Sequence, residues 1–355
     1  MNNKAIVAMS GGVDSAVAAL LVKQAGYDTA GITLKLWSEA ERVTDTDSGT
    51  TNNDIEDAKK IAEILGIPHI VSSLGDSFRA CVIDKFISDY VRGATPNPCV
   101  ECNRYIKFGK LLDITLDLGY NKLATGHYAI VEKSPSGRYI IKKAVDASKD
   151  QSYMLWSLTQ DTLSHVILPL GIYKKSEIRE LAAENGFVNA HKSDSQDICF
   201  IPDGDYAKFI RENTDIDFPC GNFVDVNGNI LGQHDGIIKY TVGQRKGLGI
   251  ALGRPVFVKS KDPATNTVTI CDNDELFSKR LTASRANFIA CDDIPAATNL
   301  LAKIRYKHEA SPATVIQTDK DKFVLEFKEP QRAIASGQSV VLYDGDTLVG
   351  GGIID

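Results

Sequence analysis

Two groups of residues have types and spacing that could do chemistry: a glycine-rich run near the N-terminus and three cysteines. The run Ser10–Ser15 reads SGGVDS, and it follows an apolar segment, Ala5–Met9, that predicts a buried strand. Apolar residues recur at helical spacing from Val13 onward. Adjacent glycines let the chain turn sharply there and leave N–H groups exposed at the positive end of the helix. The run therefore predicts a phosphate-binding loop.

This run is not a Walker A loop, because the spacing G-x-x-x-x-G-K-[ST] is absent and no lysine follows the glycines. Ser10 and Ser15 can donate hydroxyl hydrogen bonds to a phosphate. Asp14 stands where that lysine would be, and its carboxylate is a candidate to help hold Mg²⁺. A plain Gly-Gly turn is the alternative interpretation, but a six-residue match at the first strand is more specific.

Cys99 and Cys102 form the C-x-x-C pair of the sequence, and Cys199 stands just before an expected domain boundary. A helix start beside Cys102, with Arg104 and Lys107 nearby, is expected to push its thiol toward thiolate. Three interpretations compete for these cysteines: structural zinc, a thioredoxin-like pair, and sulfur chemistry in which one thiol carries a persulfide that another resolves.

Zinc would need a further ligand, which His127 or His191 could supply only by chance. The remaining cysteines are expected to be small buried apolar residues: Cys81, Cys220, Cys271 and Cys291. An odd total of seven cysteines does not indicate a disulfide framework and fits a reducing cytoplasm.

The first part of the chain alternates predicted strands and helices. Strands are expected at 5–9, 29–36, 68–72 and 123–128, helices from 13 and at 55–65 (with Asp54 as N-cap), 77–91, 103–118, 151–158 and 175–185, and a hairpin at 128–132 and 138–142. A non-helical loop is expected at 95–99 and a mobile one up to residue 53. Such alternation predicts a parallel sheet whose ligands bind beyond the carboxyl ends of its strands.

After about residue 202 the chain becomes β-rich. A helix is expected at 203–213, then hairpins around Asn227-Gly228 and between 256–260 and 267–271, and further short strands at 300–305, 313–318, 323–327, 339–343 and 348–353. Evenly spaced short strands predict a small barrel. We therefore expect an α/β protein with three domains: residues 1–202, a β-rich central domain at 203–274, and a C-terminal β-barrel at 275–355.

The composition is that of a soluble globular protein with a net charge of −6, and no signal peptide or membrane span is expected. The negative charge argues weakly against a nucleic-acid partner, although a local basic surface would be enough to bind one. Candidate basic patches are 142–143, 174–175, 245–246, 279–285 and 303–307.

The chain resembles the tRNA-specific 2-thiouridylases, a family of N-type ATP pyrophosphatases. The motifs that carry this resemblance span nearly the whole sequence: SGGVDS (10–15), TPNPCVECN (95–103), ATGHYA (124–129), SKDQSY (148–153), DSQDICFIP (194–202), TVGQRKGLGI (241–250), IRY (304–306), SGQSVVLY (336–343) and GGGIID (350–355).

The resemblance implies an adenine nucleotide α-hydrolase-like domain that uses ATP and Mg²⁺ to adenylate the C2 oxygen of the wobble uridine of tRNA. It implies catalytic roles for Asp14, Cys199 (persulfide carrier) and Cys102 (partner nucleophile, which releases sulfide or forms a Cys102–Cys199 disulfide). It places ATP against Ala8, Met9, Ser10, Gly11, Gly12, Val13, Asp14, Ser15, Leu34 and Gly126. The target base would meet Asn97, Pro98 and Cys99, and tRNA would meet His127, Lys149, Asp150, Gln151, Arg305, Tyr306 and Gln338. The implied partners are the tRNA anticodon stem-loop and a sulfur-donor protein, in a cytoplasmic monomer.

The sequence departs from the family at Cys99, where many members have an aspartate that is proposed to handle protons. That acid–base role therefore has no carboxylate here, and Cys99, Cys102 and Cys199 could instead hold a [4Fe–4S] cluster. Two other functions compete with thiolation: a ligase that adenylates a small molecule, and a non-catalytic RNA-binding or sulfur-carrier protein.

Overall fold

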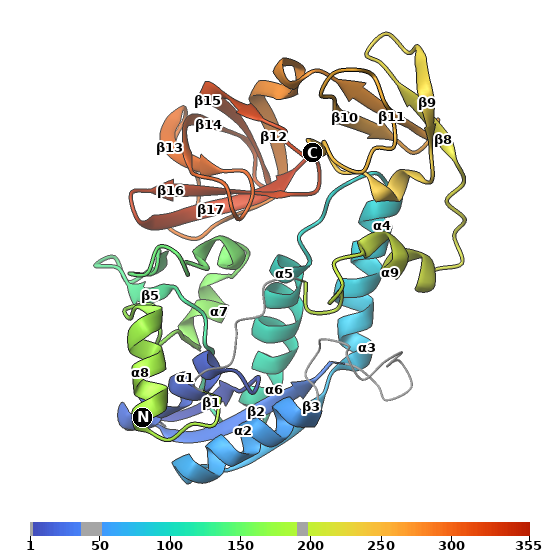
Figure 1. The fold of residues 1–355 in the computed structure, drawn as a ribbon. Helices are drawn as coiled ribbons and strands as arrows, with labels where there is room; N and C mark the ends of the chain where they lie inside the picture. Colours follow the sequence, from blue (N-terminus) through green and yellow to red (C-terminus); the bar gives the residue numbers. More distant parts are fainter. Residues whose placement is uncertain (1–2, 37–51, 190–197) are drawn as a thin grey trace. The chain divides into compact units, whose positions relative to one another are not determined.

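The computed structural model describes residues 3–36, 52–189 and 198–355. The chain forms two compact units (Figure 1). The first contains residues 1–82, 99–204 and 344–349, and the second contains residues 83–98, 205–343 and 350–355. The expected mobile loop before residue 53 lies almost wholly outside the described residues.

The first unit is built on a parallel sheet in the order β3-β2-β1-β4-β7. Its strands are β1 (Lys4–Ala8), β2 (Asp28–Lys35), β3 (His69–Ser73), β4 (Lys122–Ala124) and β7 (Val166–Ile167). The centre of β1 is fully buried, as a strand covered on both faces requires. This confirms the predicted α/β architecture.

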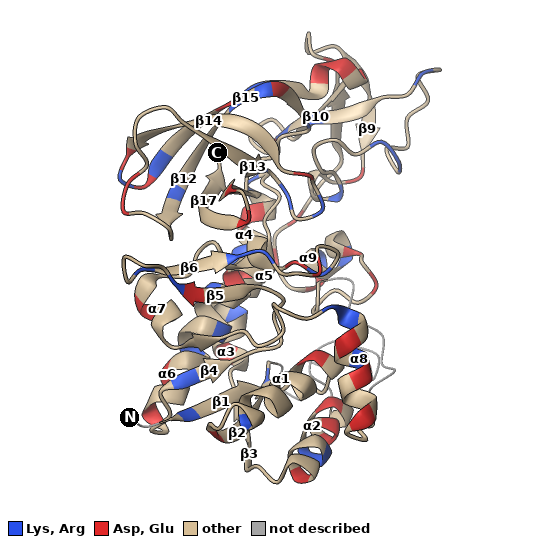
Figure 2. Cartoon of the chain, turned by 90° about the vertical axis from the view of Figure 1, so that its left-hand side faces the viewer, with Lys and Arg blue, Asp and Glu red and all other residues tan. Residues whose placement is uncertain are grey.

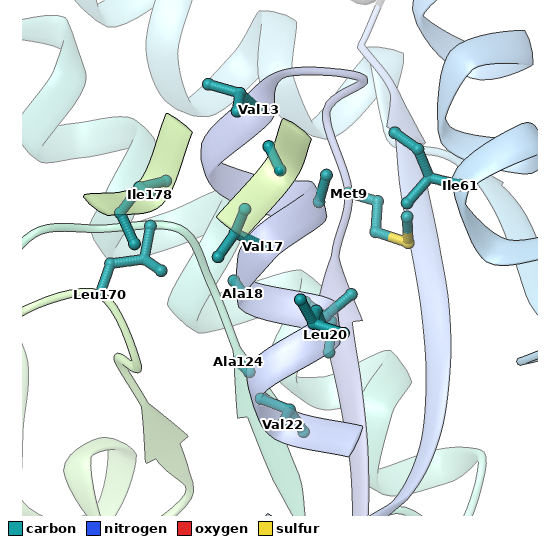
Figure 3. Close-up of a cluster of buried hydrophobic side chains, with 14 of the residues drawn as sticks. Met9, Val13, Val17, Ala18, Leu20, Val22, Ile61, Ala124, Leu170 and Ile178 are labelled. Atoms are coloured by element: carbon teal, nitrogen blue, oxygen red, sulfur yellow. The ribbon is translucent and has the colours of Figure 1, made fainter. Parts of the chain in front are cut away.

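Helices α1 (Val13–Gln24), α2 (Asn52–Leu65) and α8 (Lys175–Glu184) supply much of the core of this unit. Figure 3 shows Val17 and Ala18 of α1 beside Ile178 of α8, with Leu170 next to them. Helix α1 is apolar on nearly all sides because it is enclosed by other elements. The prediction that Asp54 caps α2 was wrong, since the helix begins two residues earlier, at Asn52.

Two long helical stretches contain π-helical turns that apolar periodicity cannot predict. One comprises α3 (Gly75–Phe78), η2 (Arg79–Ile83) and α4 (Asp84–Val91), and the other α5 (Pro98–Glu101), η3 (Cys102–Lys110) and α6 (Leu111–Asp117). The second stretch begins at Pro98, so the prediction of a non-helical loop through Cys99 and a helix from residue 103 was wrong there. Proline suits the first turn of a helix, whose N–H groups have no partner.

Two other expected elements are shorter in the structure. The expected strand at 123–128 ends at Ala124, and the expected helix at 151–158 is a 3-10 turn, η4 (Ser152–Leu155). The hairpin of β5 (Ile130–Lys133) and β6 (Tyr139–Lys142) forms as predicted, followed by α7 (Gln160–Ser164). Strand β6 pairs with Thr347 and Leu348, close to the C-terminal end of the sequence.

The second unit contains α9 (Tyr206–Glu212) and a four-stranded sheet in the order β10-β11-β8-β9. The strands are β8 (Gly221–Val224), β9 (Ile230–His234), β10 (Phe257–Asp262) and β11 (Thr267–Cys271), and two 3-10 turns accompany them, η5 (Ile237–Lys239) and η6 (Asn273–Leu276). Both predicted hairpins are present, because β8 pairs with β9 and β10 pairs with β11.

The C-terminal strands form a closed six-stranded barrel, which confirms the predicted barrel. They are β12 (Phe277–Phe288), β13 (Thr298–Lys303), β14 (Ser311–Asp319), β15 (Lys322–Arg332), β16 (Ser339–Asp344) and β17 (Thr347–Ile354). The order is β12-β15-β14-β13-β16-β17, and pairing of β12 with β17 closes it. The domain boundaries at residues 202 and 274 stay a prediction. No helix among the described residues is long and apolar enough to cross a membrane.

Candidate nucleotide and thiol sites

The glycine-rich loop joins β1 to α1 in a conformation that only glycine adopts easily. Gly11 has a φ of 71°, and a Cβ there would lie 2.5 Å from the carbonyl oxygen of Asp54 in α2. Ser15 Oγ accepts a hydrogen bond from the Ser10 amide (3.1 Å) and donates one to the Gly12 carbonyl (3.0 Å). The hydroxyl of Ser15 therefore fixes the shape of the loop, while Ser10 itself is exposed.

The loop lies at the carboxyl end of β1, where the first N–H groups of α1 have no intrahelical partners. Gly126 packs directly on that first turn, since a Cβ there would lie 2.9 Å from the Asp14 carbonyl carbon and 3.0 Å from the Ser15 nitrogen. Leu34 lies near the carboxyl end of the adjacent β2. These residues, predicted to bind ATP, thus meet at the sheet edge where parallel α/β sheets bind ligands.

Asp14 is held by two partners that the sequence analysis did not place there. Lys175 Nζ donates to both carboxylate oxygens of Asp14, at 2.7 and 2.8 Å, and the Tyr128 hydroxyl donates to Oδ1 at 2.7 Å. Lys175 is 8% exposed, although lysine is almost never fully buried without a partner. The glycine loop, which has no lysine in its own sequence, therefore has one supplied by α8.

Polar contacts fix the ends of this arrangement. The Lys175 amide donates to Asp146 Oδ2 at 3.0 Å, which anchors the start of α8. Asn189 Nδ2 donates to the Gly11 carbonyl at 2.9 Å, and the Asn189 side chain is buried. The sequence could have indicated this role of Lys175. A lysine at the start of a helix is unfavourable because of the helix dipole, which suggests that an acidic side chain pairs with it.

The three cysteines of interest interact within the first unit. Cys102 is buried, and burial raises the pKa of its thiol to about 11. Cys199 is exposed as a residue, yet loss of water around its sulfur raises its pKa to about 12, with smaller contributions from Cys102 and Cys99. The pKa of Cys99 is also raised, by burial of its sulfur. The prediction that the helix start makes Cys102 a thiolate was wrong, because desolvation of the sulfur outweighs the nearby cations.

Lys107 opposes these shifts at all three thiols, whose pKa values its charge lowers. It lies five residues after Cys102 in η3, and residues five apart lie closer to one face in a π-helix, whose hydrogen bonds join i and i+5, than in an α-helix. Burial, with a smaller contribution from the charge of Lys107, holds the pKa of His127 well below its ordinary value, which favours the neutral imidazole. His127 Nδ1 hydrogen-bonds Thr125 Oγ1 at 2.7 Å.

Several residues expected to contact tRNA make internal contacts. Gln338 Nε2 donates to the Thr95 carbonyl at 2.7 Å, Asp150 accepts from the Ser152 hydroxyl at 2.9 Å, and Gln151 Oε1 accepts from the Tyr128 amide at 3.0 Å. Arg305 donates to the Arg332 carbonyl at 3.3 Å. Their roles toward RNA, with those of Lys149, Tyr306, Asn97 and Pro98, stay predictions.

Within the described ranges, no group of three or more His, Cys, Asp or Glu side chains is arranged to hold a metal ion. Cys99, Cys102 and Cys199 are thus not grouped as metal ligands in this structure, and the [4Fe–4S] cluster stays a prediction. His191 lies outside the described residues.

A parallel sheet with a glycine loop at its carboxyl edge defines the first unit as an α/β nucleotide-binding domain. Family models match three successive regions: "tRNA methyl transferase HUP domain" at 3–203, "tRNA methyl transferase PRC-barrel domain" at 208–272 and "Aminomethyltransferase beta-barrel domain" at 278–354. The chain is 48% identical to the tRNA-specific 2-thiouridylase MnmA of Lachnoclostridium phytofermentans, over 99% of both chains. The corresponding protein of Clostridioides difficile is also 48% identical, over 100% of this chain and 99% of its own. The chain belongs to the tRNA-specific 2-thiouridylase family.

Among solved structures, the U34-tRNA thiolase NcsA from Methanococcus maripaludis with its [4Fe–4S] cluster matches at 20% identity. The match covers 60% of this chain and 66% of that one, with a TM-score of 0.33. A likeness at this level supports no inference about the site.

Proposed function

We propose that this chain is a tRNA-uridine 2-sulfurtransferase, which uses ATP to replace the C2 oxygen of the wobble uridine (position 34) with sulfur. One observation carries the proposal: a single compact unit contains both a phosphate-type loop and cysteines close enough to shift one another's pKa. Identity of 48% to 2-thiouridylases over the full length supports it. The "methyl transferase" wording of the family models is outweighed by these full-length relatives.

The first step activates the base. The uracil C2 oxygen attacks the α-phosphorus of ATP, the bond to the β-phosphate oxygen breaks, and pyrophosphate leaves. The N–H groups at the start of α1 and the exposed Ser10 hydroxyl are the proposed contacts to the phosphates. Carboxylate oxygens suit Mg²⁺, so Asp14 is the residue that would hold the ion accompanying ATP, whose charge neutralises the phosphates.

The second step transfers sulfur. The outer sulfur of a Cys199 persulfide attacks C2 of the adenylated base, and Cys102, in its minor thiolate form, then attacks the Cys199 sulfur. The S–S bond of the persulfide breaks and the outer sulfur stays on C2 of the base. AMP then leaves as the C2=S bond forms. A Cys102–Cys199 disulfide remains, and an external thiol reduces it. Exposure of Cys199 and burial of Cys102 suit these roles, since only the carrier must meet a sulfur-donor protein.

RNA would be bound as a single-stranded anticodon loop with the target base unstacked, as base-modifying enzymes require. Asn97, Pro98 and Cys99 are the proposed contacts to that base, and His127, Lys149, Asp150, Gln151, Arg305, Tyr306 and Gln338 the proposed contacts to tRNA. We further propose that the enzyme is a cytoplasmic monomer.

The decisive test separates the two steps. We expect Cys199→Ser to abolish thiolation from a protein persulfide donor while ATP is still cleaved to AMP and pyrophosphate only when tRNA is present. Inorganic sulfide should restore part of the 2-thiouridine, because it bypasses the carrier. The matched control is Cys220→Ser, at another exposed cysteine. Normal persulfide-dependent thiolation by Cys199→Ser, measured by nucleoside mass spectrometry, contradicts the assignment.

A further inference from the structure

Two helices begin at the glycine loop. Asp14 is the second residue of α1 and Lys175 is the first residue of α8, and their side chains form an ion pair with N–O distances of 2.7 and 2.8 Å. Each helix start carries a partial positive charge, so their approach is unfavourable unless an anion lies between them. In the resting protein, the Asp14 carboxylate binds the Lys175 amine, while Asp146 and Glu177 accept from the backbone amides at the start of α8.

Lys175 adds a full positive charge at the end of α8 where the dipole disfavours it. In Figure 2, α8 begins in blue and carries red bands further along, in keeping with Lys174 and Lys175 followed by Glu177, Glu180 and Glu184, with Arg179 between them. The backbone at the start of α8 has its own acidic partners, since the Lys174 amide donates to Glu177 at 2.6 Å and the Lys175 amide to Asp146 at 3.0 Å, whereas the Lys175 amine is directed to Asp14. The positive charge at the glycine loop comes from the start of α1, the start of α8 and the Lys175 amine. A ligand with more than one negative charge would therefore balance it better than the single Asp14 carboxylate does.

From this arrangement we infer that Lys175 is the phosphate-binding cation that the glycine loop lacks in its own sequence. Lys175 leaves Asp14 when ATP enters and binds the oxygens of the β- and γ-phosphates, while Asp14 becomes free for the accompanying Mg²⁺. Tyr128, whose hydroxyl also donates to Asp14, keeps the carboxylate in place during the exchange. This inference rests on the proposed use of ATP and adds a binding residue to it.

Geometry makes the exchange possible. Lys175 Nζ already lies at the first turn of α1, and its long flexible side chain can reposition the amine while the backbone stays fixed by the bond to Asp146. Neighbouring Lys174 is exposed and so provides a matched control.

The test compares nucleotides that differ only in phosphate number, by calorimetric titration of the full chain with ATP–Mg²⁺ and with AMP. Lys175→Met should weaken ATP binding by about 10- to 100-fold, the worth of a charge-assisted hydrogen bond, and leave AMP binding within about threefold. Lys175→Arg should restore part of the ATP affinity, and Lys174→Met should behave as the wild type. A merely structural role for Lys175 would weaken ATP and AMP binding equally.

Removing Lys175 leaves the Asp14 carboxylate without its cation, which could itself change ATP binding. The effect of Lys175→Met is therefore also measured in a protein in which Asp14 is replaced by the uncharged Asn. Asp14→Asn alone and Asp14→Asn with Lys175→Met differ only in the lysine, and the double variant should bind ATP more weakly than the single one. Equal ATP affinity in these two variants, or unchanged affinity in Lys175→Met, overturns the inference. Wild-type protein that binds ATP but forms no AMP with tRNA would refute the proposed function and leave the Lys175 result standing.

Discussion

Cys199 and Cys102 are predominantly protonated at neutral pH, because their pKa values are about 12 and about 11. Since the thiolate is the attacking form, an unloaded Cys199 is a poor nucleophile toward an activated base. A persulfide is more acidic than the thiol that carries it, so loading with sulfur would itself switch on attack. The raised pKa values would therefore protect the adenylated base from forming a bond to an empty carrier.

Lys107 is the residue whose charge counteracts this protonation, which can be tested directly. Lys107→Met should raise the pKa of both thiols further, so that their alkylation by iodoacetamide reaches half its maximal rate at a higher pH. Peptide mass spectrometry across a pH series would follow each cysteine separately. The control is Lys110→Met, on the same helical stretch but exposed. An unchanged or lowered midpoint in Lys107→Met would rule out this role.

At the level of elements, regular periodicity was the feature that could be predicted. The buried strand at 4–8 (predicted at 5–9) and five of the six barrel strands follow the patterns in their own sequence and were predicted, whereas β12 was not. The π-helical turn at Cys102–Lys110 was not, because it changes which residues share a face without changing composition. It also places Lys107 on the side of Cys102.

The site was predictable only in its local parts. The turn at Ser10–Ser15 could be predicted because the glycines and the helix that follows them are adjacent in the sequence. Lys175 lies 161 residues from Asp14, and a contact at that separation depends on how α8 packs against α1. The protonation of Cys102 could not be predicted either, since burial of its sulfur, which the sequence does not display, outweighs the charges that it does.

In the second unit, a strand–helix contact buries a lysine. Lys261 of β10 lies over the Tyr90 ring of α4, 5.4 Å from its centroid, and among the described residues its Nζ has no hydrogen-bond partner. Burial lowers the pKa of Lys261 from 10.5 to about 8. Between these pH values the unfolded chain binds more protons than the folded one, so the free energy of unfolding rises with pH.

Lys261→Met should therefore stabilise the protein at pH 7, by at most about 3 kcal/mol, and this advantage should shrink as pH rises from about 8 to 10.5. Urea unfolding at several pH values measures it. Lys259→Met, on the same strand and paired with Glu275 at 3.7 Å, should change the free energy of unfolding by less than about 0.5 kcal/mol. A destabilised Lys261→Met with no pH trend would contradict the account.

At the scale of the whole molecule, strand β17 contributes to both compact units. Residues 344–349 belong to the first unit, where Leu348 pairs with Ile141 of β6, and residues 350–355 belong to the second. Both Leu348 and Ile141 are fully buried. Part of the nucleotide-binding unit is thus encoded within the last twelve residues of the sequence.

Leu348→Ala should destabilise the β5–β6 hairpin by about 2–4 kcal/mol, because it removes buried apolar volume from the pairing face. Hydrogen exchange at residues 130–133 and 139–142 would accelerate accordingly. Leu342→Ala, an equally buried change in β16 of the second unit, should leave exchange in this hairpin much less affected. Equal acceleration in both variants would show that the two units unfold as one.

This shared strand has a consequence for biosynthesis. Strand β6 can pair with β5 as soon as both are made, but β17, which pairs with its other edge, is translated about 200 residues later. A polypeptide that ends before β17 would leave the edge of β6 unpaired, and an unpaired strand edge promotes aggregation and proteolysis. Loss of β17 would therefore expose the edge of β6 in the first unit.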